Sequence, residues 1–390
     1  MPQDRLARAN EISMKQGDFT VLKRNEFWSR VFTFVPTATK DDGEEIDEKA
    51  FRTAIDYQIE NGVHGVCIFG STGGNGSFSD EEMKRATAIA AKHIDGRISL
   101  VAGTGARTTT ACIALSRHAQ DVGCDAVMVL PVSYWPLTPD EVFEHYERVA
   151  KSIKIPICIY NNPWTTGVDM KPEFLARLTK LDNCNCIKES TGDLTRITAI
   201  RLLTGDQVSL IAGWESSSLQ AFMAGASGWA PVCTNFVPNL AMKFFGAAVD
   251  KRDAPAAQGM WDKLFPICDI ICTKSHIRVA HSGLDLLGRP VGQPRRPLRM
   301  LKGEDRARLK MLLTEAGANR GVPQTAGLFH HGERQLDDPA PDTGCQNVPQ
   351  KSEVLVGQPL RWPLLIKAPP YAMQLFAPFF IEALRFRSDR

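Results

Sequence analysis

The sequence predicts an α/β fold, a (β/α)8 barrel with a C-terminal helical appendix. Between residues 29 and 252, eight short segments rich in β-branched and apolar residues alternate with amphipathic segments of helical period. Continuous apolar strands separated by helices are typical of a parallel sheet covered on both faces. Eight such units in a row favour a closed barrel. An open nucleotide-binding sheet would need a glycine-rich loop after its first strand, and the first loop here lacks that pattern.

Each predicted element follows from local pattern. The predicted strands are the apolar runs 31–36, 63–69, 98–102, 126–130, 155–160, 184–188, 208–212 and 228–232. The predicted helices are the periodic segments 47–61, 80–93, 108–122, 139–152, 171–181 and 194–203. Several of these helices begin at Asp, Thr or Pro, residue types that favour a helix start.

The chain is predicted to have four parts. The barrel occupies residues 29–252, and three further helical segments (254–271, 275–287 and 304–315) predict a C-terminal helical region over residues 253–318. Residues 1–28 form an N-terminal extension. Residues 319–390 carry frequent Pro and Gly without a sustained period, so we expect a largely disordered tail there.

Composition narrows the class of protein. The chain is 43% hydrophobic with a net charge of +2, which favours neither nucleic acid nor an anionic membrane as a partner. Its ten cysteines lie mostly in apolar segments at irregular spacings, and no signal peptide precedes them, so we expect a cytoplasmic protein. The pairs Cys184/Cys186 and Cys268/Cys272 lack the spacing of a zinc site, so no metal is expected.

Three features at predicted strand ends carry the chemistry, because the active site of such a barrel lies at the C-terminal ends of its strands. Lys188 ends the sixth strand, and a buried lysine favours the neutral amine that attacks a ketone. Tyr160 ends the fifth strand, where its hydroxyl could carry protons. After the second strand, the turn Gly70-Ser-Thr-Gly-Gly74 offers the hydroxyls of Ser71 and Thr72 and backbone N–H groups to a carboxylate. Taken alone, each feature could have no catalytic role: Lys188 could be a surface lysine, Tyr160 a core aromatic residue, and the segment 70–74 a simple turn.

The same residues carry a family resemblance. The motifs are Gly70-Ser-Thr-Gly73, Ala102-Gly-Thr-Gly105, Tyr160-Asn-Asn-Pro163 and Ile187-Lys-Glu-Ser-Thr-Gly192. In this order and spacing, over residues 29–316, the chain resembles the dihydrodipicolinate synthase/N-acetylneuraminate lyase family of class I aldolases. The resemblance implies a homo-oligomer, a dimer or tetramer, whose lysine forms an imine with pyruvate or another 2-keto acid, without a separate cofactor.

By the resemblance, Lys188 is the Schiff-base lysine, Tyr160 the catalytic tyrosine, and Ser71 a catalytic hydroxyl that also binds substrate. Thr72 and Ala230 take further substrate-binding positions. Two departures concern the rest of the site. Thr165 replaces an arginine that grips the aldehyde partner in the synthase branch, and a hydroxyl cannot replace a guanidinium.

The second departure concerns the relay tyrosine that the synthase branch places after the fourth strand. Ser133 takes that position, and Tyr134 follows as a substrate-binding candidate. Trp135 and Trp164 are expected to flank the mouth, either to meet an apolar part of a substrate or to pack on neighbouring loops.

The leading hypothesis is a Schiff-base-forming lyase, an aldolase or dehydratase, acting on pyruvate or another 2-keto acid. The alternative is 4-hydroxy-tetrahydrodipicolinate (dihydrodipicolinate) synthase of lysine biosynthesis, and Thr165 separates the two. A third hypothesis is a barrel that has lost turnover and only binds. The chain has neither a G-x-S-x-G elbow nor a G-x-G-x-x-G motif that opens a helix, so hydrolase and dehydrogenase activities find no support.

Overall fold

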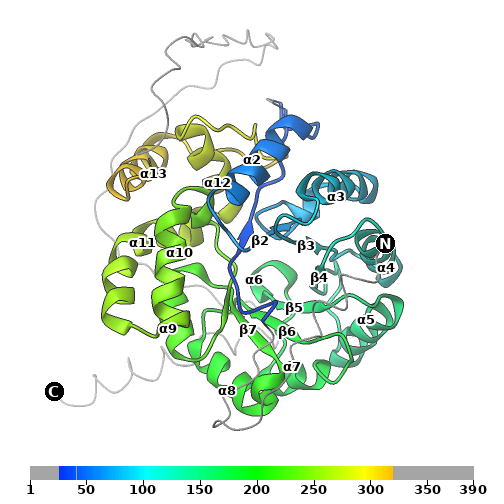
Figure 1. Cartoon of the computed structure of the whole chain (residues 1–390). Coiled ribbons are helices and arrows are strands. Elements are labelled where there is room, and N and C mark those ends of the chain that lie inside the picture. The colour runs from blue at the N-terminus through cyan, green and yellow to red at the C-terminus, as the bar shows by residue number, and fades with distance from the viewer. Residues whose placement is uncertain (1–25, 41, 319–390) are drawn as a thin grey trace, which may run out of the picture. The chain divides into compact units, whose positions relative to one another are not determined.

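Eight parallel strands form a barrel in this computed structural model, which describes residues 26–40 and 42–318 (Figure 1). The strands are β1 (Phe32–Phe34), β2 (Gly65–Ile68), β3 (Ser99–Gly103), β4 (Ala126–Val129), β5 (Ile157–Asn161), β6 (Cys186–Glu189), β7 (Ser209–Ala212) and β8 (Gly228–Trp229). They pair in chain order. A parallel bridge between Val31 and Trp229 joins β8 to β1 and closes the barrel. The predicted fold class is therefore confirmed.

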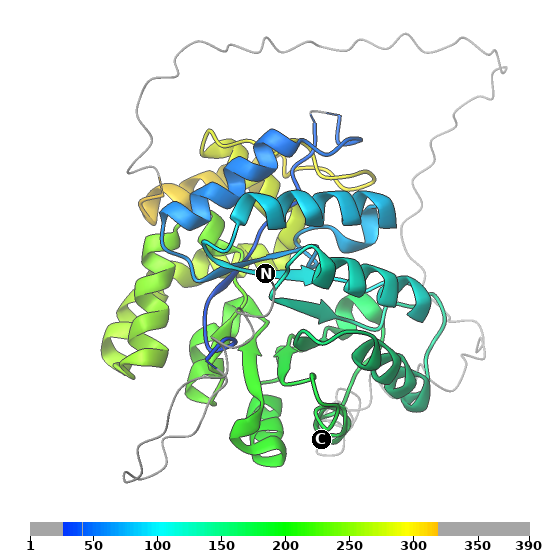
Figure 2. The same cartoon turned by 45° about the vertical axis from the view of Figure 1, so that its right-hand side comes forward.

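Helices cover the outside of the barrel (Figure 2). They are α2 (Glu48–Glu60), α3 (Asp80–Ile94), α4 (Thr109–Asp121), α5 (Pro139–Ser152), α7 (Pro172–Leu178), α8 (Leu194–Thr204), α9 (Ser218–Met223) and α10 (Pro238–Phe245). The short helix α6 (Pro163–Thr166) belongs to the loop after β5. Side-chain caps start several of them, and the capping boxes of α3 and α5 pair Ser79 with Glu82 and Thr138 with Glu141. The sequence analysis named no helix at α9 or α10, whose 6 and 8 residues are too few for a clear helical period.

Three helices form the C-terminal helical region within the described residues: α11 (Ala254–Lys274), α12 (His276–Leu286) and α13 (Gly303–Glu315). They contact one another, and α11 also packs on α10 of the barrel. Trp28 lies in the predicted N-terminal extension, yet its indole is buried and donates a hydrogen bond to Asn185 Oδ1 at 2.9 Å. The predicted tail at 319–390 lies outside the described residues. Among the described helices, none has the length and apolar character needed to cross a membrane.

One strained residue lies where β2 meets the 70–74 turn. Phe69 has a φ of 51°, in the left-handed region that bulky side chains rarely occupy. Gly103, at the end of β3, makes room for this conformation, because a Cβ there would lie 2.0 Å from the Phe69 carbonyl oxygen. The path of the chain into the turn therefore depends on a glycine in the neighbouring strand.

We expect Gly103→Ala to destabilise the protein by about 2 kcal/mol or more, because the new methyl group meets backbone that cannot move aside cheaply. Gly259→Ala is the matched control. Gly259 is exposed in α11 with no atom within 4 Å of a built Cβ, so alanine there should stabilise by roughly 0.5–1 kcal/mol. Urea unfolding measures both, and equal effects would contradict this explanation.

Candidate active site

Lys188 and Tyr160 face one another across β5 and β6, where the strand register pairs them directly. Both are buried, with exposed fractions of 4% and 3%. The Lys188 Nζ atom lies 3.6 Å from the centre of the Phe34 ring and 4.2 Å from the centre of the Tyr160 ring. The amine is therefore held between two aromatic faces inside the barrel, as the sequence analysis expected of a buried lysine.

The Tyr160 hydroxyl has two polar neighbours. Asn162 Nδ2 donates a hydrogen bond to it at 2.9 Å, and Ser71 Oγ lies 3.4 Å from it. Ser71 belongs to the turn after β2, so this contact joins two strand ends that are separated by two other strands of the barrel. A proton could pass between the two hydroxyls without crossing bulk water.

The 70–74 turn contacts residues at and after the end of β1. Thr37 Oγ1 donates to the Gly73 carbonyl oxygen at 2.8 Å, and Thr72 is buried. Gly70 lies so close to Phe34 that a Cβ would meet its ring at 2.4 Å. The same Phe34 ring therefore contacts both the turn and the Lys188 amine.

The other predicted site residues lie at different depths. Ala230 follows β8 directly and is buried, with its N–H bonded to Ala212 O at 3.4 Å. Thr165 lies exposed in the short helix α6, and its hydroxyl donates to the Asn162 carbonyl oxygen at 3.2 Å. Tyr134 is 86% exposed and contacts the Trp135 ring edge to face at 5.1 Å. The fold therefore brings Lys188, Tyr160 and Ser71 together, whereas Tyr134 lies on the surface.

Two tryptophans lie near one another after β5 and β7. Trp164 is largely exposed, and its indole N–H donates to the Thr191 carbonyl oxygen at 3.3 Å. Its ring lies 6.0 Å from that of Trp214. Thr191 follows Lys188 by three residues, so this bond ties Trp164 to the loop that begins at the lysine. Trp164 thus packs on a neighbouring loop, one of the two roles expected for it, and Trp135 contacts Tyr134. A role of either tryptophan in meeting substrate stays a prediction.

A polar network behind the lysine was not identified from the sequence. Glu189 is buried and accepts hydrogen bonds from Asn161 Nδ2 at 2.9 Å and from the Thr191 N–H at 2.8 Å. Burial raises the pKa of Glu189. Arg196 lies 4.0 Å from its carboxylate and also forms a bidentate pair with Asp169 at 2.7 and 2.9 Å. Because strand residues alternate, Glu189 faces outward while Lys188 faces inward.

A second buried carboxylate was also missed. Glu215 lies in the turn η3 (Glu215–Ser217) after β7 and accepts the N–H groups of Val232 at 3.0 Å and Cys233 at 2.7 Å. Cys268 Sγ of α11 lies 3.9 Å away. Burial raises the pKa of Glu215 to about 6, although those N–H groups and the charge of Lys188 act in the opposite direction. Only its position just after a strand end could have pointed to it.

The donor atoms of Glu215, Cys233 and Cys268 lie within 4.8 Å of one another. We assign no metal to them, because the carboxylate already accepts two backbone N–H groups and burial raises the pKa of both thiols. A metal needs deprotonated sulfur. The expectation of a metal-free site stays a prediction.

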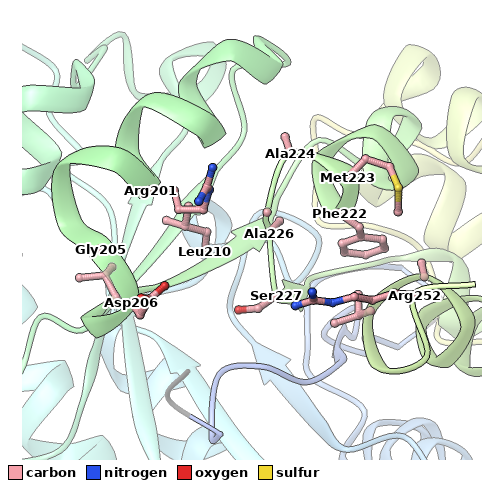
Figure 3. A pocket seen from close by; sticks show the side chains of 14 residues that line it. Arg201, Gly205, Asp206, Leu210, Phe222, Met223, Ala224, Ala226, Ser227 and Arg252 are labelled. Atoms are coloured by element: carbon pink, nitrogen blue, oxygen red, sulfur yellow. The ribbon is translucent and has the colours of Figure 1, made fainter. Parts of the chain in front are cut away.

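A cavity of about 340 Å³ lies at the opposite end of the barrel, where β7 and β8 begin (Figure 3). Arg201, Asp206, Ser227 and Arg252 are among its lining residues. None of the residues around Lys188 lines it, so it is separate from the candidate active site.

Comparisons with known proteins give a consistent result. Residues 28–316 match the model of the dihydrodipicolinate synthetase family. The chain is 32% identical over 278 residues to the 4-hydroxy-tetrahydrodipicolinate synthase of Syntrophobacter fumaroxidans, which covers 70% of this chain and 94% of that relative. Among solved structures, it is similar to the dihydrodipicolinate synthase of Agrobacterium tumefaciens (29% identity, TM-score 0.70, 75% and 99% of the two chains). It is also similar to a pyruvate complex of the chloride-inhibited synthase of Acinetobacter baumannii (26% identity, TM-score 0.71, 75% and 99%).

Proposed function

Because the chain belongs to the dihydrodipicolinate synthetase family and is thus an enzyme of the lyase class, we propose that Lys188 forms a covalent imine with pyruvate or another 2-keto acid. The observation that carries this proposal is the buried Lys188 amine over the Tyr160 ring, whose hydroxyl lies 3.4 Å from Ser71 of the 70–74 turn. The hypothesis of a barrel that only binds loses support, because the matched relatives are named as synthases.

The proposed first half-reaction uses only groups of this chain. The lone pair of the Lys188 amine attacks the keto carbon, and the former carbonyl oxygen takes up protons and leaves as water. The nitrogen keeps a double bond to carbon, as a cationic imine. The overall change consumes one proton and releases one water, and the Tyr160 hydroxyl is placed to carry the protons. Ser71 and Thr72 would receive the substrate carboxylate, and no further cofactor is required. Cytoplasmic location and a homo-oligomeric state remain predictions.

The relatives favour the alternative of the sequence analysis, 4-hydroxy-tetrahydrodipicolinate synthase, over its broader leading hypothesis. The synthase is therefore the first specific reaction to test, with aspartate semialdehyde as the second substrate. The side chain of Thr165 argues against tight binding of that aldehyde, because its hydroxyl carries no charge and already donates a hydrogen bond to the Asn162 carbonyl oxygen. An aldolase or dehydratase acting on another 2-keto acid is the second candidate.

The imine is tested by reducing the protein with borohydride in the presence of pyruvate. We expect one adduct per chain by mass spectrometry, and we expect Lys188→Ala to abolish it, because no other amine among the described residues lies beside Tyr160. Lys180→Ala, at an exposed position on the same barrel, should keep the adduct. An adduct that survives Lys188→Ala would show that another lysine reacts.

Proton transfer is tested with Tyr160→Phe. We expect kcat to fall about 10²-fold or more with a smaller change in KM, as for loss of a group that moves protons rather than one that binds. Tyr57→Phe is the control, because Tyr57 is a half-buried tyrosine of α2 whose ring and hydroxyl contact Arg289 instead. If kcat stays unchanged in Tyr160→Phe, a water or another side chain carries the proton.

The second substrate is tested by a synthase assay with pyruvate and aspartate semialdehyde. We expect weak activity in the unmodified protein, and an increase in kcat/KM of about 10-fold or more in Thr165→Arg, since a well-placed charged hydrogen bond contributes roughly 1.5–3 kcal/mol. Thr166→Arg, one residue further along, is the control. Absence of synthase activity in both the unmodified protein and Thr165→Arg, alongside an intact pyruvate adduct, would exclude the synthase and leave the broader lyase hypothesis.

A further inference from the structure

Glu215 contacts the loop after β8 and helix α11 from its own position in the loop after β7. The residue follows β7, and its carboxylate accepts the Val232 and Cys233 N–H groups of the loop after β8. Cys268 of α11 approaches the same oxygen at 3.9 Å. The side chain is 2% exposed, so these contacts are shielded from water. The conformation of the loop after β8 therefore depends on this carboxylate.

The loop after β8 also forms hydrogen bonds with Phe34, whose ring contacts the Lys188 amine. The Phe34 N–H donates to the Pro231 carbonyl oxygen at 3.0 Å, and Asn235 Nδ2 donates to the Phe34 carbonyl oxygen at 3.0 Å. Both sides of the Phe34 backbone are thus fixed by the loop that Glu215 anchors. The Phe34 ring lies 3.6 Å from Lys188 Nζ. A displacement of the loop would move the ring and loosen the amine.

Glu215 also has the charge that a cationic nitrogen needs nearby. Among the described residues, Glu189 and Glu215 are the two buried carboxylates. Glu189 faces outward, with Arg196 at 4.0 Å, whereas no salt bridge to Glu215 is formed by any described residue. A positive charge on Lys188 lowers the pKa of Glu215, against the larger effect of burial. An imine on Lys188 carries a fixed positive charge, which Glu215 is placed to balance at low dielectric.

We propose that Glu215 is a positioning residue for the imine on Lys188: its carboxylate anchors the loop after β8 that seats Phe34 against the amine, and its negative charge stabilises the cationic imine. This inference rests on the proposed imine chemistry and holds for either second substrate. Glu215 has no contact with the substrate in this role, because both its oxygens are occupied by the protein.

The proposal implies that the rate of imine formation depends on pH through the protonation of Glu215. The neighbouring titratable groups do not change charge in the same range. Cys233 and Cys268 face the carboxylate, and Cys272 lies further along α11. Burial raises the pKa of all three thiols, that of Cys272 to about 12. Burial and the charge of Lys188 lower the pKa of His276, at the start of α12, to about 4. These groups stay neutral near pH 6, where Glu215 gains a proton as the pH falls and loses its charge.

The test compares unmodified protein with Glu215→Gln, which keeps one oxygen for the loop but removes the charge. Formation of the pyruvate adduct is followed from pH 5 to 8 by trapping with cyanoborohydride, which acts in mild acid. In the unmodified protein we expect the trapping rate to fall below about pH 6. In Glu215→Gln we expect a rate about 10-fold lower at pH 8, no fall centred near pH 6, and a pyruvate KM within about 3-fold. Glu189→Gln, the other buried carboxylate, should retain the acid limb.

Three results would count against the inference. A Glu215→Gln profile that matches the unmodified protein in rate and acid limb overturns it. A flat profile from pH 5 to 7 in the unmodified protein overturns it as well, whether or not the variant folds. Failure of the unmodified protein to form any adduct with pyruvate or other 2-keto acids overturns the proposed function together with this inference, so the two failures are distinguishable.

Discussion

The burial of one primary amine is the constraint on which the rest of the site depends. Lys188 is held among aromatic rings rather than water, and removing its polar amine from solvent is costly unless its surroundings compensate. The compensation comes from the faces of Phe34 and Tyr160 and from a carboxylate further out. Phe34 requires a glycine at position 70, and its backbone requires the loop after β8. The local requirements around the lysine therefore reach the ends of β1, β2, β5 and β8 as well as its own strand, β6.

The alternation of side chains along β6 divides the polar groups into two sets. Lys188 faces the barrel interior, where imine chemistry is proposed, while Glu189 faces outward to Asn161 and Arg196. The outward set anchors the strand end and the start of α8. Two ionisable residues that follow each other in sequence thus serve different purposes, and Glu215, in a different loop, supplies the counter-charge for the proposed imine on Lys188.

The proposed reacting groups and the residues that would select a second substrate lie on different parts of the fold. The buried lysine and tyrosine lie on the strands themselves, whereas Thr165 and the exposed tryptophans lie on loops and on the short helix α6. In barrels of this kind the strands fix the reacting groups and the loops select the partner. Similarity to the synthases is therefore a stronger argument for the first half-reaction than for the identity of the aldehyde.

The sequence by itself determined the barrel and the central pair of the site. Apolar runs separated by helical period predict parallel strands, and a residue at a strand end in such a barrel must lie at the mouth, so Lys188 and Tyr160 could be placed from local pattern alone. Helices as short as α9 carry too few residues for that pattern to appear. The left-handed Phe69, the contact of Phe34 with the amine, and the bond from Glu215 to Cys233 depend on segments that are distant in the chain. The pairing of neighbouring strands sets the first and third of these. Closure of the barrel, through the pairing of Val31 with Trp229, brings the first and last strands together and so decides where the Phe34 ring meets the amine.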